Sequence, residues 1–420
     1  MFGVSGYWRR LLVVGFSLSL LSGCYKRERT NPFDPNGPQN GAGIELHVSS
    51  ERTTVFLDWS RVESPDLVHY IIYKGTLNRA PVPYDTLEAD QLSFTDTHVS
   101  ADSTYIYGIT LLGHQSETPL NVLDTITPGY SRWWVLSSES SDITELSSDG
   151  LHKVQSIGYF SSPRLLTTYS NSSTLFVYDL YSGTMYSQSG GHDPVLLLSG
   201  IYQLQSVLFN HQLGELVLVH YNHNLEFYSV TNDTRDQVQF DHNITASGMS
   251  SNGRVWIATG DSLYFFNPGV HQSHLFGSRL TGQSITAITP VNSAEIFIAR
   301  QANGLIQKVS ADSTITLTTE IPEPVQLTYD ASTENLWVRA FNKDSNTFEV
   351  YLYQNGVIQK MLSGISYAFD FAVNPITHSC LIADYDRNIV YRIDPDGTVR
   401  HTGDLPGGIH EIVVQTLGNN

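Results

Sequence analysis

Short apolar runs separated by polar turns recur along this chain, and residues 44–127 contain no long stretch with apolar residues at the helical spacing of 3.6. Segments such as TVFLDW at 54–59 and VWIAT at 255–259 are alternating or continuously apolar over five or six residues. Such runs, rich in β-branched and aromatic residues and bounded by Gly, Asn, Asp or Ser, are typical of strands. The pattern therefore predicts an all-β chain.

Residues 44–128 hold three such segments in a recognisable order. A tryptophan ends the first (54–59), tyrosines 70 and 73 lie in the second (69–74), and Tyr105 and Tyr107 alternate in the third (103–110). This order and spacing resemble the fibronectin type III sandwich over the whole segment. Modules of this kind often act as spacers in bacterial surface proteins, so the resemblance implies a spacer, with a binding module as the alternative.

The fibronectin resemblance also implies which side chains fill the core between the two sheets. It places Trp59 there, with Ile71 or Tyr73 from the second segment and Tyr105 or Tyr107 from the third.

Residues 129–420 repeat one pattern at intervals of about 40 residues. Each copy has an apolar run, a polar turn, a strongly apolar second strand and a third strand that ends in Asn, Asp or Gly. The second-strand segments are 132–135, 164–167, 216–219, 255–258, 296–299, 336–339 and 380–383, and third-strand segments include 174–183, 262–269, 349–356 and 388–397. Seven copies of a four-stranded unit predict a seven-bladed β-propeller.

The two ends of this region complement each other. Residues 131–157 supply three strands without a preceding inner one, and residues 409–415 (IHEIVVQ) form a lone strand of the inner type. Pairing them closes the ring with N- and C-terminal strands and removes an open sheet edge.

Two repeat copies resemble known propeller repeats. Residues 381–397 are similar to an NHL repeat, and residues 255–267 are similar to a YVTN-like repeat of bacterial sensor ectodomains. Some NHL propellers are lyases or lactone hydrolases with a metal in the channel, so this resemblance keeps an enzymatic alternative open. The sensor resemblance keeps open a sensory ectodomain partner.

The N-terminus carries an export pattern. Arg9 and Arg10 precede the apolar run 11–21, which is too short to span a bilayer as a helix. The sequence LSGC at 21–24 resembles the lipobox of bacterial lipoproteins, which implies a signal peptide at 1–23 and lipid on Cys24. An uncleaved anchor, or an ordinary signal with an incidental cysteine, is the alternative.

Residues 24–43 predict a flexible tether, because proline, glycine and asparagine are frequent there. The motif NPFDP at 31–35 is similar to one that follows the lipidated cysteine in some surface lipoproteins. Tyr25, where an aspartate would retain a lipoprotein in the inner membrane, implies the outer membrane as the location in the cell envelope.

The charge and the cysteine content limit which molecules can bind the chain and which disulfides it can form. The net charge is −18, and Arg9, Arg10, Lys26, Arg27 and Arg29 precede residue 30, so the folded part is more acidic than the total suggests. An acidic surface repels phosphate backbones, which argues against nucleic acid as a partner. Lipid on Cys24 would leave Cys380 without a disulfide partner.

Candidate chemistry is sparse, and we predict no catalytic residue and no cofactor. His220, His223 and His242 are the candidate ligands if the channel holds a metal, although solvated loop histidines explain them as well. The loop aromatics Tyr202, Tyr221 and Tyr367 are candidates for contacting carbohydrate or peptide, with packing at the blade rims as the alternative.

These features favour a lipid-anchored, non-enzymatic binding or assembly protein, with a protein or glycan ligand on the propeller face. An NHL-type lyase or hydrolase and a sensory ectodomain partner remain the alternatives.

The lipobox predicts that Cys24→Ala abolishes lipid attachment, because the thiol is the only atom that can receive the diacylglycerol. Metabolic labelling with radioactive palmitate measures this, and Cys380→Ala is the matched control that should label like the wild type. Label retained in Cys24→Ala would contradict the assignment.

Overall fold

The computed structural model describes residue 33 and residues 44–169, 174–189, 192–276 and 284–417. Cys24 and the predicted signal peptide and tether lie outside these residues, apart from residue 33. Contacts divide the chain into two compact units, of which the first includes Phe56–Thr95 and Tyr105–Thr125 and the second includes Ile126–Asn420. No helix in the described residues has the length and apolar character needed to cross a membrane.

Residues 46–126 form two sheets. One contains β1 (Leu46–Glu51), β2 (Thr54–Trp59) and β5 (Ser93–Asp96), and the other contains β4 (Arg79–Glu88), β3 (Leu67–Thr76), β6 (Tyr105–Gly113) and β7 (Val122–Ile126) in that order.

The core of these sheets confirms two of the expected side chains and corrects a third. Trp59 and Tyr107 are buried, and Trp59 packs against Tyr70 with ring centroids 5.5 Å apart. On β3, however, Tyr70 and Ile72 are the buried residues, so the expectation of Ile71 or Tyr73 is wrong. Because side chains alternate between the two faces of a strand, a shift of one residue along β3 exchanges the buried and the outer face. Tyr73 lies on the outer face, where it donates a hydrogen bond to Glu117 at 2.7 Å.

The second unit consists of four-stranded antiparallel sheets that follow one another along the chain. Three of them contain β11 (Pro163–Thr168), β12 (Thr174–Asp179), β13 (Thr184–Ser189) and β14 (Val195–Ser199); β15 (Leu204–Asn210), β16 (Glu215–His220), β17 (Asn224–Ser229) and β18 (Thr234–Gln239); and β19 (Ala246–Met249), β20 (Val255–Thr259), β21 (Ser262–Phe266) and β22 (His274–Leu275).

Three further sheets continue the series after residue 284. They contain β23 (Ala287–Pro290), β24 (Glu295–Arg300), β25 (Leu305–Ser310) and β26 (Thr314–Thr318); β27 (Pro324–Asp330), β28 (Asn335–Asn342), β29 (Thr347–Gln354) and β30 (Val357–Ile365); and β31 (Phe371–Val373), β32 (Cys380–Asp384), β33 (Ile389–Ile393) and β34 (Val399–His401). A 3-10 helix, η2 (Gln301–Asn303), lies between β24 and β25.

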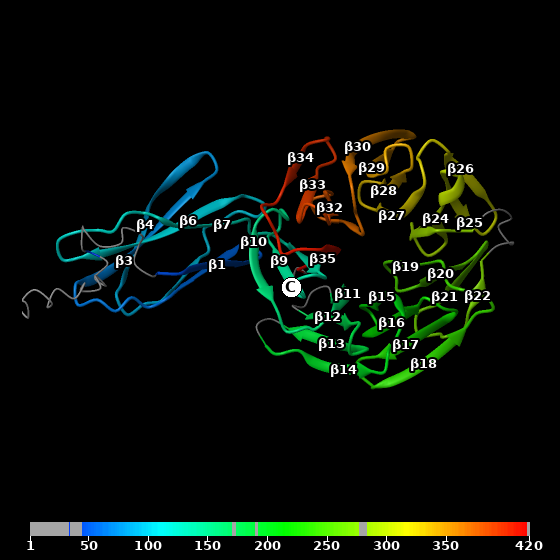
Figure 1. The fold of residues 1–420 in the computed structure, drawn as a ribbon, viewed down its shortest axis with the longest axis horizontal. Helices are drawn as coiled ribbons and strands as arrows, with labels where there is room; N and C mark the ends of the chain where they lie inside the picture. The colour runs from blue at the N-terminus through cyan, green and yellow to red at the C-terminus, as the bar shows by residue number, and fades with distance from the viewer. Residues whose placement is uncertain (1–32, 34–43, 170–173, 190–191, 277–283, 418–420) are drawn as a thin grey trace, which may run out of the picture. The chain divides into compact units, whose positions relative to one another are not determined.

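The last strand joins a sheet from the start of the unit. β35 (Ile409–Thr416) pairs antiparallel with β8 (Ser131–Ser137), which continues into β9 (Asp142–Leu146) and β10 (Lys153–Ile157). This is the pairing that the sequence predicted for the two ends. Figure 1 shows the sheets of this unit following one another around a common centre.

The first strands of these sheets contact each other in a closed cycle. Each first strand contacts the next one, in the order β35, β11, β15, β19, β23, β27, β31 and back to β35. Because every sheet begins at the centre and runs outward, the first strands line the central channel.

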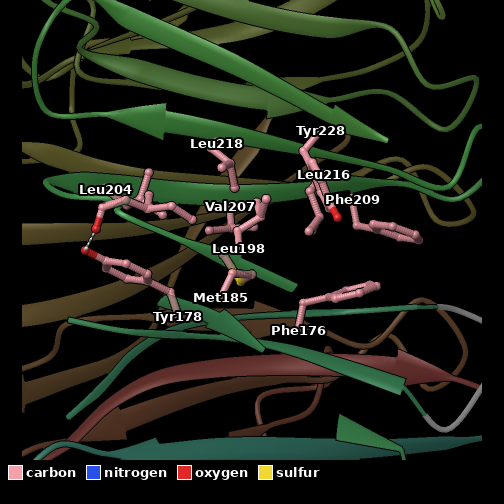
Figure 2. Close-up of a cluster of buried hydrophobic side chains, with 11 residues drawn as sticks. Phe176, Tyr178, Met185, Leu198, Leu204, Val207, Phe209, Leu216, Leu218 and Tyr228 are labelled. Carbon is pink, nitrogen blue, oxygen red and sulfur yellow. Dashed lines mark hydrogen bonds between the residues drawn. The ribbon is translucent and has the colours of Figure 1, made fainter. Parts of the chain in front are cut away.

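Apolar side chains fill the space between neighbouring sheets. In one cluster, Phe176 and Tyr178 of β12 face Leu216 and Leu218 of β16, and the Tyr178 hydroxyl donates to the carbonyl of Ile201 at 3.2 Å (Figure 2). Large rings recur on the second strands, where three fully buried tryptophans lie: Trp133, Trp256 and Trp337. Such burial stabilises each sheet only when its neighbour is present.

One copy of the repeat was assigned to the wrong strand. Residues 164–167 lie in β11, the first strand of its sheet, and the expected third strand at 174–183 begins with β12, the second. Both segments are short and apolar, and apolar content alone does not distinguish a first strand from a second. This shift also accounts for the longer interval before 216–219.

Closure by β35 predicts that Ile412→Ala is strongly destabilising. Ile412 is 2% exposed and packs in a cluster with Trp133 and Leu381, so the free energy of unfolding should fall by about 2–4 kcal/mol. Urea unfolding measures it, with Val399→Ala on the outer strand β34 as a control that changes stability by about 0.5 kcal/mol or less. Equal effects of the two substitutions would contradict closure.

Candidate functional site

A cavity of about 500 Å³ opens where the first strands begin. Most of its polar lining residues lie near the start of a first strand or just before one: Arg164 on β11, Gln205 on β15, Ser247 on β19, Gln326 on β27, Asp370 before β31, and His410 and Glu411 on β35. Arg339 of the second strand β28 also lines the cavity. We call this cavity the channel mouth.

β-Bulges aim several of these side chains into the channel mouth. The register of first and second strands shifts at Arg164 on β11, at Gln205 on β15, at Val325 on β27 and at His410 on β35. Each skipped residue lines the cavity. A bulge inserts one residue without a partner and breaks the strict alternation of faces, so a side chain at this position turns away from the sheet packing.

Two carboxylates lie at the channel mouth. Asp370 accepts hydrogen bonds from Gln326 Nε2 at 2.5 Å and from the backbone N–H of Ile412 at 3.0 Å. Glu411 accepts one from the backbone N–H of Leu166 at 2.6 Å. Burial raises the pKa of both carboxyls, and for Glu411 the neighbouring Asp370 raises it further, to well above its usual range.

Two arginines accompany the carboxylates. Arg339 is buried, donates from Nη1 to the carbonyl of Ala368 and lies 5.5 Å from the ring centroid of Phe348. Burial lowers its pKa to about 10, so it stays charged at neutral pH, and Asp370 is its neighbouring anion. Arg164 is half-buried and makes no hydrogen bond or ion pair with any described residue.

His410 completes the charged and polar lining. It is 8% exposed, and its ring centroid lies 5.3 Å from that of Phe369. Burial, assisted by Arg164, lowers its pKa to about 4, so the imidazole is neutral at pH 7. Its Nδ1, like the Oε1 atoms of Gln205 and Gln326, is buried without a hydrogen-bond partner among the described residues. Buried polar atoms without a partner are rare, and a bound water, ion or other group is one way to satisfy them.

A second cavity, also of about 500 Å³, shares Val325, Arg339 and Phe369 with the channel mouth. Aromatic rings follow it in a continuous series, from Phe341 to Phe348 (5.2 Å between centroids), Tyr367 (6.4 Å), Phe369 (4.9 Å) and Tyr385 (5.3 Å). We call these five residues the aromatic strip. Each is at least partly exposed.

The structure separates the three candidate tyrosines. Tyr221 lines the channel mouth and Tyr367 belongs to the aromatic strip, with exposed fractions of 62% and 49%. Tyr202 is also exposed, but it lines neither cavity.

The candidate histidines have separate partners. His220 Nδ1 lies 2.9 Å from the carbonyl of Tyr202 and its Nε2 lies 3.8 Å from Glu226, whereas His223 contacts Gln239 and His242 is exposed. Within the described ranges, no group of three or more His, Cys, Asp or Glu side chains has an arrangement that would hold a metal ion.

The charged lining was missed from the sequence. Recurrence of one residue type from copy to copy does not reveal it, because the lining combines arginine, aspartate, histidine and glutamate and lies in only some sheets. Its charged residues are Arg164, Arg339, Asp370, His410 and Glu411. A usable signal was present, because a charged residue inside an otherwise apolar first strand, as in IHEIVV at 409–414, is rarely buried without a role.

Comparisons with known proteins support the fold. A functionally unknown protein from Desulfotomaculum acetoxidans is 16% identical, with a TM-score of 0.53 over 68% of this chain and 99% of its own. Apo AztD from Citrobacter koseri is 11% identical, with a TM-score of 0.52 over 68% of this chain and 97% of its own. No protein family matches the sequence, and neither does any curated protein. Both structures are β-propellers, and the second unit of this chain therefore has a β-propeller fold.

The low pKa of His410 predicts a specific acid sensitivity. The folded protein holds this imidazole neutral down to about pH 4, whereas the unfolded chain protonates it near pH 6.5. Its contribution to stability is therefore complete above pH 6.5 and is lost as the pH falls towards 4, by about 3 kcal/mol in total.

Urea unfolding at pH 7 and 4.5 measures this loss as the difference between the wild type and His410→Gln. Between pH 7 and 4.5, the free energy of unfolding of the variant should fall by about 2–3 kcal/mol less than that of the wild type. The exposed His242→Gln is the control and should behave as the wild type does. The same acid sensitivity in His410→Gln and the wild type would rule out this role.

Proposed function

We propose that this chain is a non-enzymatic binding or assembly module whose seven-bladed propeller engages its ligand at the channel mouth and the aromatic strip. The closed cycle of first strands, with one four-stranded sheet behind each, supports the number of blades. The ligand class that we infer for the propeller is a protein or a glycan.

The observation that carries this proposal is the continuity of the two cavities. A polar recess with unpartnered buried atoms leads directly into a surface of partly exposed rings through Val325, Arg339 and Phe369. Polar groups that fix orientation, beside apolar area that supplies affinity, are the usual composition of a binding site. Aromatic rings have few rotatable bonds, so ordering them on binding costs little conformational entropy.

The remaining parts of the proposal rest on the sequence. The fibronectin type III-like sandwich at residues 44–128 is the spacer, and lipid on Cys24 attaches the chain to the cell envelope, at the outer membrane. Sheets β1-β2-β5 and β4-β3-β6-β7 support a sandwich of this kind.

Binding of the purified protein to a panel of immobilised envelope polysaccharides and envelope proteins tests the function. Tyr367→Ala and Tyr221→Ala should each weaken the binding of a ligand by about tenfold, because each removes an exposed ring from the proposed surface. Tyr202→Ala is the matched control, because this ring is equally exposed but lines neither cavity, and it should bind as the wild type does.

Two results would contradict the proposal. The first is a ligand whose affinity falls in Tyr202→Ala but not in the other two variants. The second is turnover of a bound compound that is lost in His220→Ala or His242→Ala, which would make the propeller an enzyme.

A further inference from the structure

The charged groups of the channel mouth do not balance each other. Asp370 is the neighbouring anion of Arg339 and is held by Gln326 and the backbone of Ile412. His410 is neutral, and the pKa of Glu411 is raised well above its usual range, which favours its protonated form. Arg164, in contrast, lines the cavity without a hydrogen bond or ion pair to a described residue.

This charge is unusual for its surroundings. The chain has 41 acidic and 23 basic residues, so an exposed arginine has many carboxylates available on the surface. Arg164 instead sits at a β-bulge that turns it into the cavity, where it makes no hydrogen bond or ion pair with a described residue. Its guanidinium presents five N–H donors in a planar fork, which matches the two oxygens of a carboxylate.

Other groups at the channel mouth could bind the carboxylate of a ligand together with Arg164. Glu411 Oε2 accepts a hydrogen bond from the backbone N–H of Leu166, whereas its Oε1 has no hydrogen-bond partner among the described residues. A protonated Glu411 therefore has an O–H to donate. His410 carries a neutral imidazole beside it, and Tyr221 also lines the cavity.

We propose that the channel mouth binds the carboxylate of an acidic sugar, with Arg164 as the cation that pairs with it and the aromatic strip stacking on the sugar ring. This inference rests on the proposed binding function and names its ligand class. A sugar is favoured over a peptide because the second cavity offers flat, partly exposed rings, and Asn346, Gln301 and Ser366 in the same lining offer polar groups for hydroxyls.

The arrangement gives binding a pH dependence with a definite sign. The groups that face Glu411 are the Asp370 carboxylate, the Arg164 guanidinium and the N–H of Leu166, with His410 next to it in the strand. As the pH rises, Glu411 loses its proton, and its carboxylate then repels the anionic ligand. Affinity should therefore fall with increasing pH while the ligand itself stays ionised.

Titration calorimetry with the purified full-length protein tests the inference, with glucuronate as the acidic sugar and glucose as its neutral analogue. Glucuronate should bind at least about tenfold more tightly than glucose, because a charge-assisted pair with Arg164 is present only for the acid. A tripeptide with a free carboxylate and the same peptide amidated form the second pair of ligands and should bind no better than glucose.

Three variants assign the contacts. Arg164→Gln should weaken glucuronate binding by about tenfold or more and leave glucose binding unchanged. Glu411→Gln should keep the affinity but lose its dependence on pH, since the amide is a neutral donor at every pH. Arg400→Gln, on the outer strand β34, is the matched control and should change nothing. The midpoint of thermal unfolding of each variant confirms that it folds.

Failure of this inference is distinguishable from failure of the proposed function. Equal affinity for glucuronate and glucose, or full affinity in Arg164→Gln, would overturn the acidic sugar and leave the binding function standing. Binding of the free-acid peptide alone would also overturn it in favour of a protein ligand. If none of the four compounds binds and no ligand of the panel depends on Tyr221 or Tyr367, both are wrong.

Discussion

The pairing of β35 with β8 is the constraint on which the second unit depends. It joins the last strand to a strand near the start of the unit, from Ile409 opposite Ser137 to Thr416 opposite Ser131, and so closes the cycle of first strands. The same strand carries His410 and Glu411 into the channel mouth and places the N–H of Ile412 on Asp370. Closure therefore stabilises the sheet packing and assembles the site in one step, and neither is complete without it.

The electrostatics of the site follow from that closure. Within a cavity walled by protein, water screens a charge only weakly, so a charged side chain that has no partner interacts strongly with a charged ligand. Arg339 has Asp370 as a charged neighbour, and burial keeps His410 neutral and raises the pKa of both Asp370 and Glu411. Arg164 is a cation at the channel mouth that has no hydrogen bond or ion pair with a described residue, and the rings of the aromatic strip lie on the adjoining cavity.

The sequence predicted the fold better than the site, for a physical reason. Alternation and repeat spacing report burial against neighbouring sheets, and they located most second strands and the closing strand at 409–415. They failed at 164–167 and on β3, where a shift by one strand or one residue leaves the apolar content unchanged. The charged lining depends on bulges at Arg164, Gln205 and His410, and a bulge interrupts the alternation from which side-chain direction is inferred. Of the loop aromatics, Tyr221 and Tyr367 lie at the cavities and Tyr202 does not.

A crystal structure of the protein in complex with glucuronate is the most direct test of the central claim, that the channel mouth is the ligand site. The account predicts the sugar carboxylate within hydrogen-bond distance of the Arg164 guanidinium, with the ring against Phe369 or Tyr367. A sugar bound elsewhere on the chain, with the channel mouth holding only solvent, would contradict the claim.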